Sequence, residues 1–165
     1  MLAKTKIKVA VVDDEAQMRE MLKDFVEQKF PAAKISSFAS GEEALEKIYE
    51  EPHVVILDYN LDADNSEAMN GVQILKKLKD RYPDVNVVFV SGQERAEVAA
   101  NTMRYGAYDY IVKNENAFHR LEIVMKNILG NTDLKKTAGT QKFFNYLLGA
   151  LIIALIIGII VMRVK

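Results

Sequence analysis

Residues 53–58 read HVVILD, a short apolar run that ends abruptly in a carboxylate. A strand that is apolar throughout, without alternation, is expected where helices cover both faces of a parallel sheet. Four more short runs rich in β-branched residues lie on either side of it, at residues 7–12, 34–38, 86–91 and 108–112. The five runs and the segments between them predict a doubly wound α/β domain built from βα repeats.

The segments between these runs carry apolar residues at helical spacing. Ser40-Gly41-Glu42-Glu43 has the form of a capping box, which predicts that the second helix starts there. Gly130 is expected to end the fifth helix. Three apolar stripes indicate the buried faces of the first, third and fifth helices. They are Met18, Met21, Leu22 and Phe25; Val72, Leu75 and Leu78; and Leu121, Val124, Met125 and Ile128.

Polar side chains follow the predicted strands at their carboxyl ends. Asp13 and Asp14 follow the first strand and Asp58 the third, while Ser91 ends the fourth and Lys113 follows the fifth. Because ligands of open α/β sheets bind at these strand ends, we expect the five side chains to share one pocket. Three nearby carboxylates repel one another by roughly 1 kcal/mol per pair in water, so the cluster calls for a cation. Oxygen ligands, without any cysteine in the chain, indicate Mg²⁺.

This set of groups suits phosphoryl transfer. A carboxylate beside a divalent ion, here Asp58, can act as the nucleophile toward a phosphoryl group. The ion and Lys113 neutralise charge on the transferring oxygens, and the Ser91 hydroxyl hydrogen-bonds the product. Tyr110, on the last strand, is then expected to exchange between outward and inward rotamers. Taken singly, Asp13 is explained as a helix cap and Lys113 as a surface lysine. Such purely structural explanations would all have to coincide at one edge of the sheet, so the chemical interpretation is favoured.

Four motifs, VVDDE, VVILDYN, VFVSG and GAYDYIVK, together resemble the signature of response-regulator receiver domains over residues 5–130. The resemblance implies a flavodoxin-like fold, with a five-stranded parallel sheet in the order 2-1-3-4-5. It also implies that Asp58 is the phosphoacceptor. The other implied roles are Mg²⁺ ligation by Asp13, Asp14, Asp58 and the backbone carbonyl of Asn60, catalytic support from Lys113 and Ser91, switching by Ser91 and Tyr110, and tuning of the phosphoryl lifetime by Asn60 and Gln93.

A function in phosphorelay signalling follows from the same resemblance. It implies a sensor histidine kinase or phosphotransfer protein as the phosphodonor and an unidentified downstream protein as the target. The chain is then not an enzyme, beyond catalysing its own phosphorylation and dephosphorylation. The alternative is a membrane-tethered adaptor whose phosphorylation chemistry is vestigial. A phosphatase similar to the haloacid dehalogenases is disfavoured, because their nucleophile follows the first strand and Asp58 follows the third.

The charge distribution bears on the partners. All 23 acidic residues lie before residue 134, whereas Arg163 and Lys165 are the two of the 22 basic residues that lie beyond residue 142. The part of the chain before residue 143 is therefore slightly acidic, which gives no support for a nucleic-acid partner.

Two departures from the family pattern matter. Asp58 is followed by YNLDADNSEAMNG, so Gly71, which is expected to start the third helix, comes later than usual and leaves an acidic loop at residues 59–70. That loop is either solvated beside the site, or it adds a ligand or restricts which kinase docks. Asn114 follows Lys113 where the family usually has a proline in a cis bond. We expect a trans bond here, because a cis bond before a non-proline residue costs about 2.5–4 kcal/mol.

The composition changes sharply after the receiver domain, which is expected to span residues 1–130. Residues 131–142 are polar and are predicted to form a linker. Residues 143–162 contain no charged residue, and a helix of that length spans about 30 Å, the thickness of a bilayer hydrocarbon core. A buried core helix or an oligomerisation helix is the alternative, but residues 148–162 are apolar on every face.

We therefore predict a single-pass protein of the inner (cytoplasmic) membrane, with membrane lipid as a partner and the receiver domain in the cytoplasm. Ala150, Ala154 and Gly158 repeat every four residues, a spacing that favours helix dimerisation in membranes. A homodimer is thus one expectation, and chance spacing of small residues is the other.

Overall fold

The computed structural model describes residues 7–61 and 68–130 of the 165-residue chain. Five strands form one sheet in the order β2-β1-β3-β4-β5, and every neighbouring pair is parallel. This sheet confirms the predicted fold class and strand order, and each predicted strand end is correct to within one residue. The strands are β1 (Lys8–Val12), β2 (Lys34–Phe38), β3 (Val54–Leu57), β4 (Asn86–Ser91) and β5 (Asp109–Val112).

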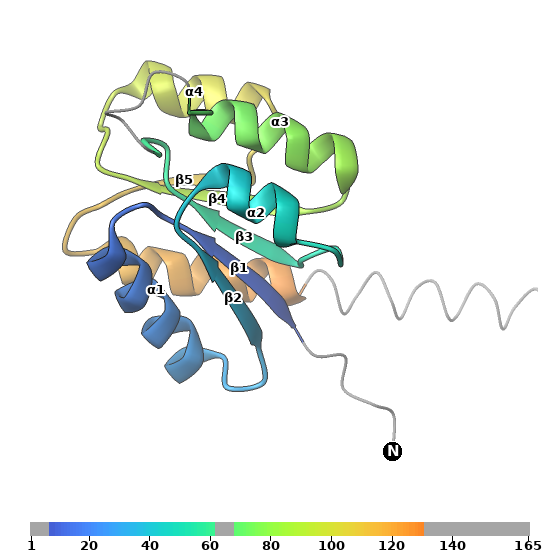
Figure 1. Ribbon diagram of the computed structural model, residues 1–165. Helices are drawn as coiled ribbons and strands as arrows, with labels where there is room; N and C mark the ends of the chain where they lie inside the picture. Colours follow the sequence, from blue (N-terminus) through green and yellow to red (C-terminus); the bar gives the residue numbers. More distant parts are fainter. Residues whose placement is uncertain (1–6, 62–67, 131–165) are drawn as a thin grey trace, which may run out of the picture. The chain divides into compact units, whose positions relative to one another are not determined.

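Helices cover both faces of the sheet, as the apolar strands predicted. In Figure 1, α2, α3 and α4 lie on one face, and α1 lies on the other face with the helix that begins at residue 117. The chain divides into two units, Met1–Lys126 and Asn127–Lys165, and the site described below lies in the first. The helices are α1 (Ala16–Lys29), α2 (Gly41–Lys47), α3 (Gly71–Arg81), α4 (Ala96–Arg104) and a helix described over residues 117–130.

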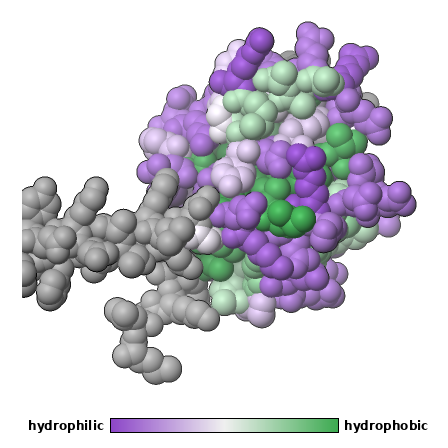
Figure 2. Space-filling view, turned by 180° about the vertical axis from the view of Figure 1, so that it is seen from behind, coloured by the Kyte–Doolittle hydropathy of each residue, from purple (hydrophilic) through white to green (hydrophobic). Residues whose placement is uncertain are grey.

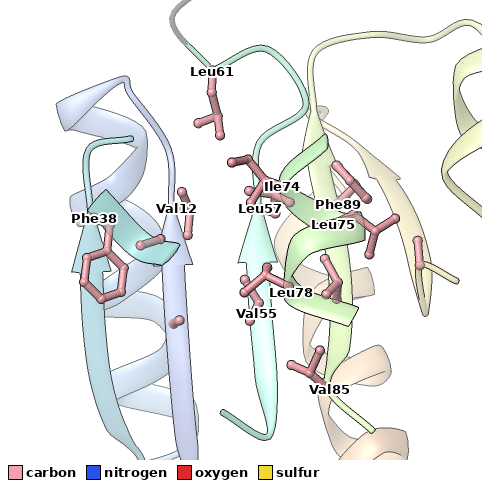
Figure 3. Packing of buried hydrophobic residues seen from close by; sticks show 14 of the residues in the cluster. Val12, Phe38, Val55, Leu57, Leu61, Ile74, Leu75, Leu78, Val85 and Phe89 are labelled. Atoms are coloured by element: carbon pink, nitrogen blue, oxygen red, sulfur yellow. The ribbon is translucent and has the colours of Figure 1, made fainter. Parts of the chain in front are cut away.

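One part of the core lies between the central strands and α3. Leu57 of β3 and Phe89 of β4 are fully buried, and Leu75 and Leu78 of α3 pack against the same cluster (Figure 3). Burying one such side chain contributes roughly 1.5–3 kcal/mol. β1 and β3 are buried along almost their whole length, whereas the edge strand β2 exposes three of its five residues. The central strands are therefore rigidly held, and the candidate site lies at their carboxyl ends.

Two helix starts are fixed by side-chain caps. At α2, the Ser40 hydroxyl accepts a hydrogen bond from the Glu43 amide, which confirms the predicted start, but the Glu43 carboxylate accepts from the Ala39 amide and not from that of Ser40. At α3, Asn70 and Gln73 form a complete capping box that sequence analysis missed. The Asn70 side-chain oxygen accepts from the amides of Val72 and Gln73, and the Gln73 side chain accepts from the Asn70 amide. The box sets where α3 begins.

Replacing Asn70 with alanine is expected to lower the free energy of unfolding by about 1 kcal/mol, because two amides of the first turn lose their acceptor. Urea unfolding followed by circular dichroism measures the effect. Gln73→Ala is the matched control, since it removes the return bond alone and is expected to cost less. Equal unfolding midpoints for Asn70→Ala and the wild type would contradict this account of the cap.

The apolar stripe predicted for α1 is partly wrong. Leu22 is buried, but Met21 is 44% exposed and Phe25 is half-buried, while the fully buried Val26 was not in the predicted stripe. The physical reason is an open hollow of about 260 Å³ between α1 and the helix that begins at residue 117. Met18 and Met21 line this hollow, so they face it and not the closed core. Figure 2 shows one face of the molecule, on which hydrophobic residues are exposed among hydrophilic ones.

Some predictions fall on residues outside the described ranges. The linker, the proposed membrane span at residues 143–162 and the acidic residues Asp62, Asp64 and Glu67 are among them, as is the end of the last helix. Within residues 7–61 and 68–130, none of the helices is long and apolar enough to span a membrane. The described base of the acidic loop is closed by two hydrogen bonds: the Gly71 amide donates to the Tyr59 carbonyl, and the Met69 amide donates to the Glu42 carboxylate.

Candidate phosphorylation site

The predicted site residues lie together at the carboxyl edge of the sheet. The strand ladder extends into them, because the Asp13 amide donates to Phe38, the Asp58 amide to Val12 at 2.8 Å and the Lys113 amide to Ser91 at 2.8 Å. Backbone bonds between neighbouring strands therefore fix where these side chains start. Asp13, Asp58 and Ser91 are buried, and Asp14 is exposed.

Lys113 bridges the two buried carboxylates. Its ammonium lies 3.0 Å from Asp13 Oδ2 and 3.5 Å from Asp58 Oδ2. The second oxygen of each carboxylate accepts a backbone bond: Asp13 Oδ1 from the Glu15 amide at 2.9 Å, and Asp58 Oδ1 from the Tyr59 amide at 2.8 Å. Asp13 thus serves as a turn acceptor at the start of α1 and as a site residue at once, and both carboxylates are held in a single orientation.

Burial sets the protonation behaviour of the site. Burial raises the pKa of both Asp13 and Asp58 above the usual value, and the nearby Lys113 only partly offsets it. Burial alone would lower the pKa of Lys113, but its hydrogen bond to Asp13 and the charges of Asp58 and Asp13 raise it. The lysine therefore stays charged, and one lysine does not compensate the acidic cluster.

The cluster fits a divalent cation. One carboxylate oxygen from each of Asp13, Asp14 and Asp58 lies within 4.8 Å of the others, close enough to bind one ion. Carboxylates are the ligands that Mg²⁺ takes in proteins, and a cation here offsets the charge that burial disfavours. Asn60 is exposed at the same edge, and the ligand role of its carbonyl stays a prediction.

Ser91, Gln93 and Tyr110 form a connected network beside the site. The Ser91 hydroxyl accepts from the Gln93 amide at 3.2 Å, and the Tyr110 hydroxyl donates to the Gln93 carbonyl at 2.9 Å. Burial raises the pKa of Tyr110, and a hydrogen bond from Ser91 opposes that rise. The Tyr110 ring is buried and stacks on Phe89 with the ring centroids 6.1 Å apart. In this structure Tyr110 is inward, so the outward rotamer that we predicted stays a prediction.

Two further residues bear on the sequence predictions. Asn114 follows Lys113 through a trans bond, as predicted, since no cis peptide bond occurs among the described residues. Its side chain accepts from the Asn116 amide, and its carbonyl accepts from the Ala117 amide. Arg19 was not predicted: its guanidinium reaches back from α1 to the carbonyls of Asp13 and Asp14. Only its place one turn into a helix after the acidic pair was visible in the sequence.

The family model for the response regulator receiver domain matches residues 9–125, which include every residue of this site. The chain belongs to the response regulator receiver domain family. Receiver domains act in two-component phosphorelay signalling, bind Mg²⁺ at an acidic pocket and interact with histidine kinases or phosphotransfer proteins. In this receiver domain the acidic pocket consists of Asp13, Asp14 and Asp58.

Three similar proteins place the receiver domain among its relatives. A putative NtrX-like response regulator of Rickettsia bellii is 35% identical over 131 residues, which cover 79% of this chain and 26% of that protein. The BeF3-activated receiver domain of DrrB, a Thermotoga maritima response regulator, is 27% identical with a TM-score of 0.66, covering 75% of this chain and 97% of that one. NtrX from Brucella abortus is 28% identical with a TM-score of 0.68, covering 80% and 29%. The chain spans only about a third or less of the curated relatives it matches.

Mg²⁺ is expected to stabilise this receiver domain, because the ion compensates carboxylates that are buried only in the folded chain. At a free Mg²⁺ concentration about 100 times the dissociation constant, the free energy of unfolding is expected to rise by about 2.7 kcal/mol. Thermal unfolding with and without Mg²⁺ at constant ionic strength measures the gain. Asp13→Asn should abolish most of it, whereas Asp80→Asn, on the exposed side of α3, should leave it intact. An equal gain in all three proteins would place the ion elsewhere.

Proposed function

We propose that this receiver domain accepts a phosphoryl group on Asp58 from a histidine kinase or phosphotransfer protein, and that phosphorylation switches a protein-interaction surface at the membrane. The observation that carries the proposal is the position of the Lys113 ammonium, in reach of both Asp13 and Asp58 beside a cluster that fits Mg²⁺. The half-buried lysine reaches both buried carboxylates from one position, the arrangement that phosphoryl transfer to Asp58 needs.

The residues divide the transfer among them. A carboxylate oxygen of Asp58 forms a bond to phosphorus while the bond from phosphorus to the donor breaks and the donor leaves. The Tyr59 amide keeps the carboxylate in one orientation, and the charged ammonium of Lys113 is placed to donate hydrogen bonds to the incoming phosphoryl oxygens. When bound, Mg²⁺ supplies further neutralisation of those oxygens. The chain is thus a phosphoacceptor that assists its own modification, and it turns over no other substrate.

The hollow between α1 and the helix that begins at residue 117 supports docking of the phosphodonor. It is apolar, it is lined by Met18, Met21 and Phe118, and it reaches Lys113, so a partner seated there is close to the phosphorylation site. Flexible methionines suit a surface that adapts to a partner. A helical donor that buries its apolar residues in this hollow would present its phosphoryl group at the carboxyl edge of the sheet.

Ser91 and Tyr110 are the proposed switch. A phosphoryl group on Asp58 adds negative charge and strong acceptor oxygens, which compete for the Ser91 hydroxyl. Ser91 is already tied to Gln93, and Gln93 to Tyr110, so a shift of Ser91 is transmitted to the β4–α4 turn and to the aromatic ring. We propose that Asn60 and Gln93, which stand two residues after Asp58 and Ser91, tune the lifetime of the phosphoryl group.

We further propose that residues 143–162 hold the receiver domain at the inner membrane, with the domain in the cytoplasm. The uncharged composition of that segment and the basic residues Lys142, Arg163 and Lys165 around it support this location. Membrane fractionation of the full chain and of a chain ending at residue 142 tests it. Recovery of both in the soluble fraction would refute the anchor and leave the phosphorylation proposal untouched.

The experiment that tests phosphorylation uses the full chain, acetyl phosphate and Mg²⁺. Intact-mass spectrometry is expected to show one added phosphoryl group on the wild type and none on Asp58→Asn. Asp80→Asn is the matched control, because Asp80 lies exposed on α3 and its replacement should leave the modification unchanged. An unmodified wild type would support the adaptor with vestigial chemistry, and modification that persists in Asp58→Asn would overturn the assignment of the acceptor.

A further inference from the structure

The side chain of Arg19 turns back from α1 onto the loop that carries the acidic pair. Its Nη1 atom lies 2.6 Å from the carbonyl oxygen of Asp13 and 3.3 Å from that of Asp14. Both hydrogen bonds come from one charged nitrogen of a half-buried side chain. Hydrogen bonds from a charged donor are stronger than neutral ones, so this contact holds two consecutive peptide groups together.

These carbonyls lie in a loop that belongs to neither neighbouring element. β1 ends at Val12 and α1 begins at Ala16, so residues 13–15 lie outside both the strand and the helix. The N-cap residue Glu15 makes no side-chain capping bond to α1. The bond to the Asp13 carbonyl is partly buried, where a carbonyl without a partner is costly, and the same guanidinium also reaches the exposed carbonyl of Asp14.

We propose that Arg19 is a positioning residue for the Mg²⁺ site, acting through the backbone of Asp13 and Asp14 and not on the ion itself. The inference rests on the proposed Mg²⁺-dependent phosphorylation. Asp13 has additional restraints, because its carboxylate is held by the Glu15 amide and Lys113. The carboxylate of Asp14 projects from the same stretch of backbone, whose carbonyl Arg19 also holds.

The direction in which Mg²⁺ affinity changes when Arg19 is replaced distinguishes this positioning role from a purely electrostatic one. Arg19 is a positive charge near a cation site, so by Coulomb's law its removal alone should make Mg²⁺ bind more tightly. If Arg19 positions the ligands, its removal instead makes the loop more mobile. Part of the free energy of Mg²⁺ binding is then used to order the loop, so the Mg²⁺ affinity falls. Residues that orient metal ligands typically change metal affinity 10–100-fold when they are replaced.

Isothermal titration of Mg²⁺ into the full chain in detergent micelles tests the proposal without measuring phosphorylation. Arg19→Met is expected to weaken Mg²⁺ binding by about 10-fold or more. Lys23→Met is the matched control: it removes a positive charge one turn further along α1, where Lys23 pairs with Glu20 at 3.3 Å and does not contact the loop. Lys23→Met should bind Mg²⁺ as the wild type does, or slightly more tightly.

Arg19→Lys provides a second variant that keeps the charge, but its ammonium ends one bond short of the Nη1 position that reaches both carbonyls. Its Mg²⁺ affinity is expected to lie between those of the wild type and Arg19→Met, and it decides the question if Arg19→Met does not fold. Wild-type or tighter affinity in both variants would overturn the inference, even if their unfolding temperatures fall. An equal loss in Lys23→Met would also overturn it. A wild type that binds no Mg²⁺ would overturn the proposed function together with this inference.

Discussion

Replacing Lys113 with methionine is expected to slow phosphorylation of Asp58 by about two to three orders of magnitude. The ammonium lies 3.5 Å from Asp58 Oδ2, so it is placed to contact the oxygens of a phosphoryl group that arrives there. Removing one fixed donor from the position where charge develops typically costs about 10²–10³ in rate. Methionine matches the apolar stem of lysine in length, so the lower phosphorylation rate reflects the missing charge more than a cavity.

The rate of mass gain with acetyl phosphate and Mg²⁺ measures this effect. Lys47→Met is the matched control, because Lys47 makes an exposed ion pair with Glu43. This variant should be phosphorylated at the wild-type rate. Lys113→Met also leaves Asp13 and Asp58 without their cation, so Mg²⁺ affinity should rise or stay constant while the rate falls. A Lys113→Met variant that is modified as fast as Lys47→Met would remove the lysine from the mechanism.

Replacing Gly71 with alanine is expected to lower the free energy of unfolding by about 2–3 kcal/mol, the upper part of the range for overpacking. A Cβ atom on Gly71 would lie 2.8 Å from the Asp58 carbonyl oxygen, 2.8 Å from Phe89 Cε1 and 3.0 Å from Tyr59 Cα. Two of these atoms belong to the backbone directly after β3, which is fixed by the sheet. The clash therefore has to move either the start of α3 or the acceptor strand itself.

Urea unfolding of Gly71→Ala measures the loss, and Gly92→Ala is the matched control. A Cβ on Gly92 meets nothing within 4 Å, so that variant should unfold within about 0.5 kcal/mol of the wild type. Because the displaced atoms adjoin Asp58, Gly71→Ala is also expected to phosphorylate more slowly. Equal stability of the two alanine variants would show that α3 moves aside freely at this contact.

Much of this architecture is local and therefore readable from the sequence. β3 is apolar along its whole length because helices cover both of its faces, and Asp58 marks its end. The same logic placed Asp13, Ser91 and Lys113 at strand ends, since parallel strands bring their carboxyl ends to one edge. The trans bond before Asn114 followed from the cost of the alternative.

Other features depend on contacts between distant segments, which a single sequence does not display. The exposure of Met21 reflects a hollow that forms only when α1 meets the helix from residue 117. Gly71 was expected to start α3, but its close approach to the strand carrying Asp58 is a tertiary fact. Arg19 reads as an ordinary helix residue, because the sequence does not say that its side chain turns back to the preceding loop.

The strand order has a consequence for how the chain folds as it is synthesised. β2 and β3 both pair with β1, β4 pairs with β3, and β5 pairs with β4. Each strand that leaves the ribosome after the first therefore finds its neighbour already made, and the sheet can grow outward without waiting for a later segment. Parallel pairing is slow because long loops must close first, and the growing edge is prone to aggregation while it waits. Only the second edge of β1 waits for more than the next strand, because it stays open until β3 follows β2.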